Sequence, residues 1–132
     1  MVKQPLNHPP LRGRKWGAHW EKTAESYLCA SGLKLLNRNF SCRFGEIDLI
    51  MEDEKTIVFV EVKYRKSAQH GSGAEAITFH KQERLSRTAA WYLAKHPYRA
   101  DQFCRFDVVA IEPETSGQNI HWIKSAFYST LG

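Results

Sequence analysis

Two neighbouring stretches, GEIDLIM at residues 45–51 and VFVEVKYR at residues 58–65, decide how the middle of this chain folds. Side chains alternate between the two faces along a β-strand, so the first stretch predicts Glu46 and Asp48 on one face. The opposite face of that strand is expected to carry Ile47, Leu49 and Met51. A polar turn around residues 53–54 follows, and the two stretches are therefore predicted to pair as an antiparallel hairpin.

The second strand repeats the pattern with a lysine added. Glu61, Lys63 and Arg65 share one face by alternation. The other face is expected to carry Val58, Val60, Val62 and Tyr64. The hairpin thus collects three carboxylates and a lysine in one region, which is the chemistry of a metal-dependent phosphodiesterase.

Two interpretations of these charges are open. Carboxylates and lysines on the wet face of an antiparallel ribbon commonly do no more than pair across strands. In this chain, however, Ile57 and Phe59 precede Glu61 on its face, and Ile50 closely follows Asp48. Such apolar runs favour strands that are covered on both sides. Carboxylates there need a compensating cation, so we expect a metal ion, a lysine or both beside Asp48 and Glu61.

Composition and charge are consistent with a single domain that binds a polyanion. The chain has 132 residues and a formal net charge of +5, and this length can bury a core without disulfides. Residues 1–20 and 61–105 carry net charges of +4 and +5, whereas residues 21–60 and 106–132 carry −2 each. An acidic region within a basic chain suits a metal-using enzyme that acts on nucleic acid, although basic charge alone is weak evidence.

The cysteines and histidines indicate neither disulfides nor zinc. Cys29, Cys42 and Cys104 are odd in number and lack paired spacing, and the six histidines are scattered. No apolar stretch reaches the length of a signal sequence or a membrane span. The sequence therefore predicts a reduced, cytoplasmic protein without a membrane partner.

The remaining segments predict an α/β fold. Residues 1–15, with three prolines and the run RGRK, are expected to form a flexible basic arm before a single domain at residues 16–132. Helices are predicted at residues 17–31 and 78–96, and a mobile loop at residues 66–74. Strands are predicted at residues 33–40, 45–51, 58–65, 105–111 and 120–124. The order α-β-β-β-α-β-β predicts a mixed central β-sheet flanked by helices.

Both helices carry further candidate residues. Glu21 lies at the border of the first helix's apolar stripe, where it could face a pocket. The second helix is expected to bury Leu85, Ala89, Tyr92 and Leu93. Another of its faces carries Lys81, Arg84, Thr88, Trp91 and Lys95, which is either a surface for a phosphate backbone or simply a solvated face. Among later residues, Asp107 is expected to be structural and Trp122 to lie in the core.

The pattern of Asp48, a turn and then Glu61-Val62-Lys63 resembles the PD-(D/E)xK, or restriction-endonuclease-like, nuclease superfamily. The run GAHWEKTAESYLCASGLKLLNRNFSCRFGEIDLI, with VFVEVKYR, KQERL and FDVVAI after it, resembles the YraN-type family of uncharacterised bacterial proteins. This likeness covers roughly residues 13–127. The layout is also similar to archaeal Holliday-junction resolvases, which carry a helix glutamate at the position of Glu21.

The resemblance implies a restriction-endonuclease-like three-layer domain that uses Mg²⁺ or Mn²⁺. Asp48, Glu61 and Glu21 would bind metal, with the backbone carbonyl of Val62 as a further ligand. Lys63 would be catalytic with Asp48 and Glu61, because it could orient or deprotonate the attacking water. Glu46 is expected beside the metal ligands rather than on the ion. Contacts to nucleic acid are expected from Arg65, Lys66, Lys81 and Arg84.

The chain departs from the superfamily pattern at two places. Glu46, rather than a proline, precedes the first-strand acid, so the literal PD dipeptide is absent. Gln82 is followed at the QxxxY spacing by Ser86 instead of a tyrosine. Neither departure removes an expected metal ligand.

The sequence therefore predicts a Mg²⁺-dependent endonuclease that hydrolyses phosphodiester bonds in branched or structured DNA. The alternative is a nucleic-acid-binding protein on a nuclease-like fold without turnover, and a third interpretation is a purely structural hairpin. Junction cleavage would need two sites, and hence a twofold homodimer.

Overall fold

The structure, a computed structural model, describes residues 13–65, 77–114 and 117–131. Its elements are, in chain order, α1 (Gly13–Ala30), β1 (Lys34–Cys42), β2 (Gly45–Asp53), β3 (Thr56–Tyr64), α2 (Phe79–Lys95), the short 3₁₀ helix η3 (Pro97–Arg99), β4 (Cys104–Glu114) and β5 (Gly117–Phe127). The predicted α/β fold and the order α-β-β-β-α-β-β are confirmed. The first helix begins at Gly13, inside the segment predicted to be an arm.

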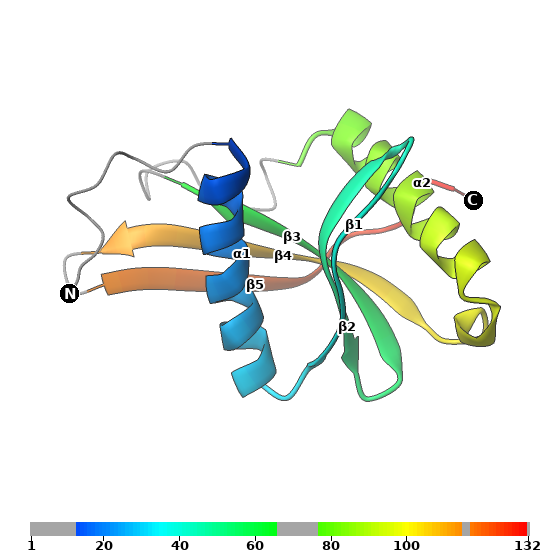
Figure 1. The fold of residues 1–132 in the computed structure, drawn as a ribbon, viewed down its shortest axis with the longest axis horizontal. Coiled ribbons are helices and arrows are strands. Elements are labelled where there is room, and N and C mark those ends of the chain that lie inside the picture. Colours follow the sequence, from blue (N-terminus) through cyan, green and yellow to red (C-terminus); the bar gives the residue numbers. More distant parts are fainter. Residues whose placement is uncertain (1–12, 66–76, 115–116, 132) are drawn as a thin grey trace.

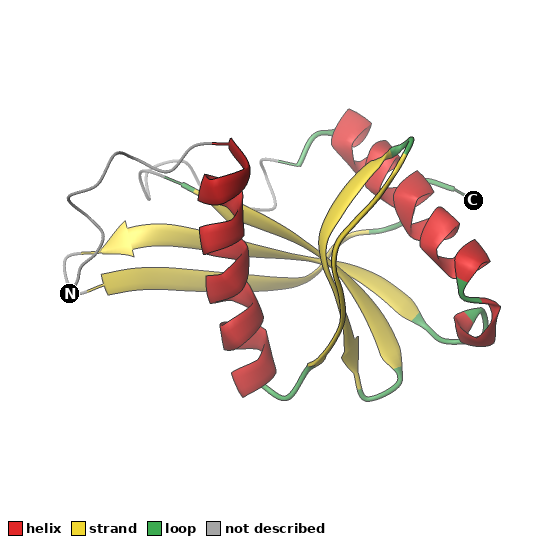
Figure 2. Cartoon of the chain, in the orientation of Figure 1, coloured by secondary structure: helices red, strands yellow, loops and turns green. Residues whose placement is uncertain are grey.

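The five strands form one mixed sheet in the order β1-β2-β3-β4-β5. Figure 2 draws the strands in yellow and the helices in red. Neighbouring strands run antiparallel except for β3 and β4, which are parallel. Parallel neighbours cannot be joined by a tight turn, so the chain between them makes a crossover that contains α2. The two helices cover different parts of this strongly twisted sheet (Figure 1).

The first helix packs against the central strands through one apolar stripe. Trp20, Ala24 and Leu28 are buried at four-residue spacing, as an amphipathic helix requires. They share a core cluster with Leu33, Leu49, Met51, Val58, Val60, Val109 and Ile111. The helix ends where Gly32 adopts a positive φ of 102° and the Leu33 amide donates to the Leu28 carbonyl at 3.1 Å, which is the bond pattern of a glycine C-cap.

The second helix packs against the other face of the sheet and contributes to a second core cluster. Its start is fixed by Thr78, whose side chain accepts from the Lys81 amide at 3.1 Å, and Pro97 follows its end. The cluster against this helix contains Ile47, Ile50, Ile57, Phe59, Ile77, Leu85, Ala89, Tyr92, Phe106, Val108 and Phe127. Strand β3 is therefore covered on both faces, as its apolar run predicts.

One predicted face is wrong in β2. Leu49 and Met51 pack with α1, but Ile47 packs with Ile50 in the cluster against α2. The alternation breaks at Asp48, between the pairs that β1 makes with Leu49 and Ile47. Asn39 lies between those pairs on β1 and has a φ of 50°, outside the β region. The local twist that this conformation produces turns Ile47 to the other layer.

The second helix also differs from prediction at Thr88. This residue was expected on the polar face with Lys81 and Arg84, yet it is fully buried. Its hydroxyl donates to the Arg84 carbonyl at 2.8 Å, and the backbone of Gly45 lies close by. Packing of the β1–β2 turn against α2, which no local pattern encodes, makes this burial favourable.

The β4–β5 pair is held by a buried carboxylate. Asp107 has no exposed surface and accepts from Arg105 Nε at 3.0 Å, Trp122 Nε1 at 2.8 Å and the Ser125 amide at 2.9 Å. These contacts agree with the structural role predicted for this residue. Trp122 is half-buried against the cluster beneath α1, close to its predicted place in the core.

Some predictions concern residues outside the described ranges. Residues 1–12 of the predicted arm and the predicted loop at residues 66–74 lie outside the described residues. Within the described ranges, Cys29, Cys42 and Cys104 are free thiols. No helix in those ranges combines the length and the hydropathy needed to cross a membrane.

Candidate active site

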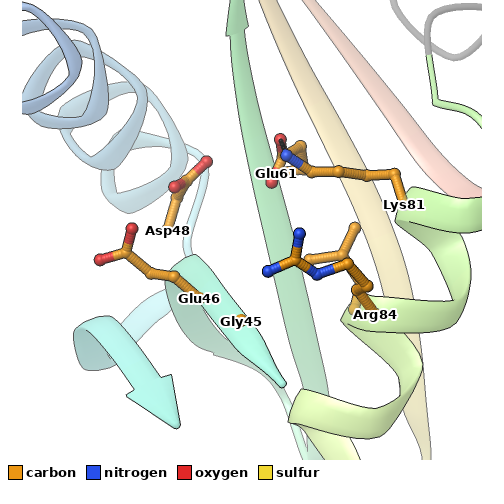
Figure 3. Close-up of a pocket in the computed structure, with 7 residues that line it drawn as sticks. Gly45, Glu46, Asp48, Glu61, Lys81 and Arg84 are labelled. Atoms are coloured by element: carbon orange, nitrogen blue, oxygen red, sulfur yellow. Dashed lines mark ion pairs between the residues drawn. The ribbon is translucent and has the colours of Figure 1, made fainter. Parts of the chain in front are cut away.

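A pocket of about 200 Å³ opens between β2, β3 and α2. It is lined by Gly45, Glu46, Asp48, Glu61, Lys81, Arg84 and Leu85. Glu46 and Asp48 come from β2, while Lys81 and Arg84 reach toward the pocket from α2 (Figure 3). Acids and bases from elements far apart in the sequence therefore meet in one cavity.

Asp48 is positioned where the β2–β3 ladder stops. The last residue pair of that ladder is Leu49 with Val60, and the amide of Val62 donates to Asp48 Oδ2 at 2.8 Å. The aspartate side chain thus takes the acceptor role that a backbone carbonyl has elsewhere in the ladder. This bond holds the carboxylate at the point where the two strands separate.

The surroundings of Asp48 favour its protonated form. Burial raises the pKa of this carboxyl well above its ordinary value, and the charges of Glu61 and then Glu21 raise it further. The hydrogen bond from the Val62 amide lowers the same pKa but does not offset the other contributions. Carboxyl groups from α1, β2 and β3 are therefore close enough to act on one another.

Glu61 has a cationic partner inside the pocket. This carboxylate is 7% exposed, and its Oε2 lies 3.1 Å from Nζ of Lys81 (Figure 3). Alternation along β3 places Glu61 on the α2 side of the sheet, and Lys81 in the first turn of that helix is within reach. The compensating lysine expected for a covered carboxylate is thus Lys81.

Glu21 enters the site from the other helix. It is half-buried, and Asn39 Nδ2 donates to its Oε1 at 2.7 Å. Its influence on the pKa of Asp48 places it on the same side of the hairpin as that carboxyl. The next glutamate of α1, Glu25, instead pairs with Arg38, with 2.8 Å between Arg38 Nε and Glu25 Oε1.

The donor set suits a hard cation. Asp48, Glu61 and Glu21 offer only carboxylate oxygen, the ligand that Mg²⁺ and Mn²⁺ prefer over softer donors. Within the ranges that the structure describes, no group of three or more His, Cys, Asp or Glu side chains is arranged to hold a metal ion. The chemistry of the residues fits the ion, while Glu61 is paired with Lys81 at 3.1 Å in this arrangement.

Arg84 forms the basic wall of the pocket. Its Nε donates to the backbone carbonyl of Phe44 at 3.0 Å, and its guanidinium lies over the backbone of Gly45. Gly45 has a φ of 149°, a conformation that side chains disfavour, and a Cβ there would lie 3.4 Å from Arg84 Nη2. That distance is an ordinary van der Waals contact, so the backbone conformation rather than space is what favours glycine at this position.

The structure brings together some predicted site residues and separates others. Glu46 is exposed and lines the pocket near Asp48. Val62 contributes its amide to Asp48, whereas the carbonyl was the predicted ligand. Lys63 and Arg65 are half-buried at the end of β3, and neither is among the described residues that line the pocket. Lys66 lies outside the described residues.

Sequence reasoning missed two residues that shape the site. Asn39 holds Glu21, and its identity was a usable signal because asparagine tolerates a positive φ better than most residues. Phe44 supplies the carbonyl that fixes Arg84. Nothing local marks Phe44, because its partner lies forty residues further along the chain.

Comparison with known proteins identifies relatives along most of the chain. The model of the uncharacterised protein family UPF0102 matches residues 20–111. A UPF0102 protein of Alcanivorax borkumensis is 44% identical over 123 residues, covering 92% of this chain and 98% of the relative. A UPF0102 protein of Nitrosococcus oceani is 45% identical over 118 residues, covering 89% of this chain and 95% of the relative.

A solved structure, Pyrococcus furiosus SfsA in complex with Ca²⁺, shows a distant likeness. The match has 16% sequence identity and a TM-score of 0.31. It covers 82% of this chain and 62% of that chain, so this chain spans less than two thirds of the neighbour's length. At this TM-score the likeness carries no argument about the site.

Proposed function

The chain belongs to the uncharacterised protein family UPF0102, and we propose from the geometry of its pocket that it is a metal-dependent nuclease acting on branched or structured DNA. The observation that carries the proposal is Asp48, which is fixed by the Val62 amide at 2.8 Å. Burial, Glu61 and Glu21 together raise the pKa of this carboxyl. Carboxyl groups that lie this close together repel one another when ionised, and a bound cation would relieve that repulsion.

Mg²⁺ or Mn²⁺ is the proposed cofactor. Bound at the site, such an ion neutralises charge on a phosphodiester and activates water for its hydrolysis. Asp48 and Glu61 would hold the ion, with Glu21 as a third or water-bridged ligand. Glu46 lines the same pocket and would lie beside these ligands.

The basic residues of the pocket have a separate task. Lys81 and Arg84 lie opposite the β2 carboxylates, where they can bind the phosphate groups of the strand to be cut. Lys81 would exchange its contact with Glu61 for a phosphate oxygen once the ion is bound. Lys63, two residues beyond Glu61 on the same face of β3, would then orient the attacking water.

The experiment is an incubation of purified protein with Mg²⁺ or Mn²⁺ and a panel of junction, flap, single-stranded and duplex DNA. Asp48→Ala and Glu61→Gln should each lower the cleavage rate at least about a hundredfold. Glu25→Gln is the matched control, because it changes a glutamate of the same helix as Glu21 that pairs outside the site. Cleavage that persists in Asp48→Ala would assign the activity to a contaminant.

A second candidate is a nucleic-acid-binding protein without turnover. The observation that favours it is the Glu61–Lys81 ion pair, in which a lysine already balances the buried carboxylate. Titration calorimetry with Mg²⁺ and Mn²⁺ separates the two candidates. Absence of heat from either ion, together with retained DNA binding in a gel-shift assay, would select the binding protein.

A further inference from the structure

A group of aromatic and basic side chains lies outside the pocket, where the β1–β2 turn meets α2. We name it the aromatic-basic strip, and it consists of Arg43, Phe44, Arg84, Arg87, Trp91 and Lys95. The rings of Phe44 and Trp91 are 6.1 Å apart and inclined at 70°. Both residues are half-buried, whereas the four cationic residues are exposed.

The cations of the strip lie over the rings. The Arg43 guanidinium is 5.0 Å from the Phe44 ring centroid and 5.8 Å from that of Trp91. Lys95 Nζ is 5.4 Å from the Trp91 centroid, and the Arg87 guanidinium is 6.0 Å from that of Phe44. At exposed positions such cation–π contacts stabilise a fold only weakly, so the folded state gains little from the group.

Most of the strip's positive charge forms no ion pair with a carboxylate of the described residues. Within the ranges that the structure describes, Arg43, Arg84 and Lys95 form no ion pair with a carboxylate; Arg87 lies 3.9 Å from Glu83. Arginines elsewhere on the surface are paired closely with acids, such as Arg38 with Glu25 at 2.8 Å. These cations are therefore available to an anionic ligand.

The strip is continuous with the pocket. Arg84 belongs to both, since it lines the cavity and donates to the carbonyl of Phe44 at 3.0 Å. Trp91 and Lys95 lie further along the same helix, two and three turns from Arg84. A strand whose phosphate sits at Arg84 would therefore run directly onto the rings.

We propose that the aromatic-basic strip binds unpaired nucleotides next to the phosphodiester in the pocket, with bases against Trp91 and Phe44 and phosphates on the arginines. The assignment of the pocket as the cleavage site rests on the function proposed above. Aromatic rings stack only on bases that are themselves unstacked, whereas a duplex presents base edges. The ligand is thus a single-stranded segment, such as the unpaired arm of a branched nucleic acid.

The test is fluorescence anisotropy with labelled fifteen-nucleotide oligothymidylate in EDTA, so that binding is measured without cleavage. Trp91→Ala should weaken binding about tenfold, and Trp91→Phe should retain most of it. The double change Arg43→Ala with Arg87→Ala should reduce the slope of log K against log salt by about 1.4, for two lost phosphate contacts.

Two control variants match these changes away from the strip. Phe103→Ala removes an aromatic side chain that is 83% exposed, and Lys124→Ala removes a lysine that lies 4.5 Å from the Trp122 ring centroid. Neither should alter binding by more than about twofold. Equal affinity of Trp91→Ala and the unchanged protein, or equal affinity for blunt duplex and single strand, would overturn the proposal.

The outcome is separable from that of the proposed function. Loss of oligothymidylate binding in the strip variants without cleavage by any form would support the strip and reject the nuclease. Cleavage that depends on Asp48, with binding unaffected by the strip variants, would reject the strip and leave the nuclease intact.

Discussion

Replacement of Lys81 by methionine tests how the pocket balances its charge. The Lys81 side chain is 46% exposed and that of Glu61 is 9% exposed, with 3.1 Å between Nζ and Oε2. Exposed ion pairs contribute about 0.2 to 1 kcal/mol, whereas removal of one partner from a buried pair costs about 3 to 5 kcal/mol. This pair lies between those cases, so Lys81→Met should lower the free energy of unfolding by about 1 to 2 kcal/mol at neutral pH.

The assay is urea-induced unfolding followed by circular dichroism, with Arg87→Met as the control. Arg87 lies 3.9 Å from Glu83, and both side chains are more than 40% exposed, so its removal should cost less than about 0.5 kcal/mol. Added Mg²⁺ should stabilise Lys81→Met more than the unchanged protein, because Glu61 is then free to bind the ion. An equal Mg²⁺ effect on both proteins would refute the idea that lysine and metal compete for Glu61.

Three other changes test the site and its support. Asp48→Asn should raise the free energy of unfolding at pH 7 by about 1 kcal/mol. The pKa of Asp48 is raised in the folded state, so the wild-type protein loses stability as the pH rises through that pKa and the carboxyl gives up its proton. The gain in thermal stability should shrink toward pH 4, and a gain independent of pH would contradict this cause. Asp107→Ala should lower the free energy of unfolding, measured with urea, by about 3 to 5 kcal/mol, because buried donors including Trp122 Nε1 lose their acceptor. A loss below about 1 kcal/mol would argue against a stabilising role for these hydrogen bonds. Gly45→Ala should lower the free energy of unfolding by about 1 kcal/mol through its positive φ, and an unchanged melting temperature would exclude that strain.

The secondary structure was largely predictable because it follows from local periodicity. The burial of Trp20, Ala24 and Leu28 follows from their spacing in α1. The two covered faces of β3 follow from its unbroken apolar run. Each of these patterns requires only that neighbouring residues obey helix or strand geometry.

The candidate site was predictable in part. Side-chain alternation along the hairpin and the position of Glu21 on its helix indicated that Glu21, Asp48 and Glu61 would lie close together. Glu61 and Glu21 both raise the pKa of Asp48, which agrees with that expectation. Lys81 and Arg84 were expected to meet phosphate, and both line the pocket. Lys63 was expected at the centre of the site, yet it is absent from the described lining.

Other features depend on contacts between distant segments. Ile47 changes layers because Asn39 on the neighbouring strand leaves the β region. Thr88 is buried because the turn at Gly45 packs on α2. Neither the packing of Ile47 nor the burial of Thr88 could be predicted from the periodicity of its own strand or helix.

The sequence by itself therefore determined the elements, their order and the acidic residues that the hairpin and first helix carry. Only the tertiary structure decided that Lys81 balances Glu61 and that Phe44 meets Trp91. The reason is physical: side-chain alternation is a property of a few consecutive residues, whereas ion pairing and ring packing depend on how the whole chain buries its apolar surface.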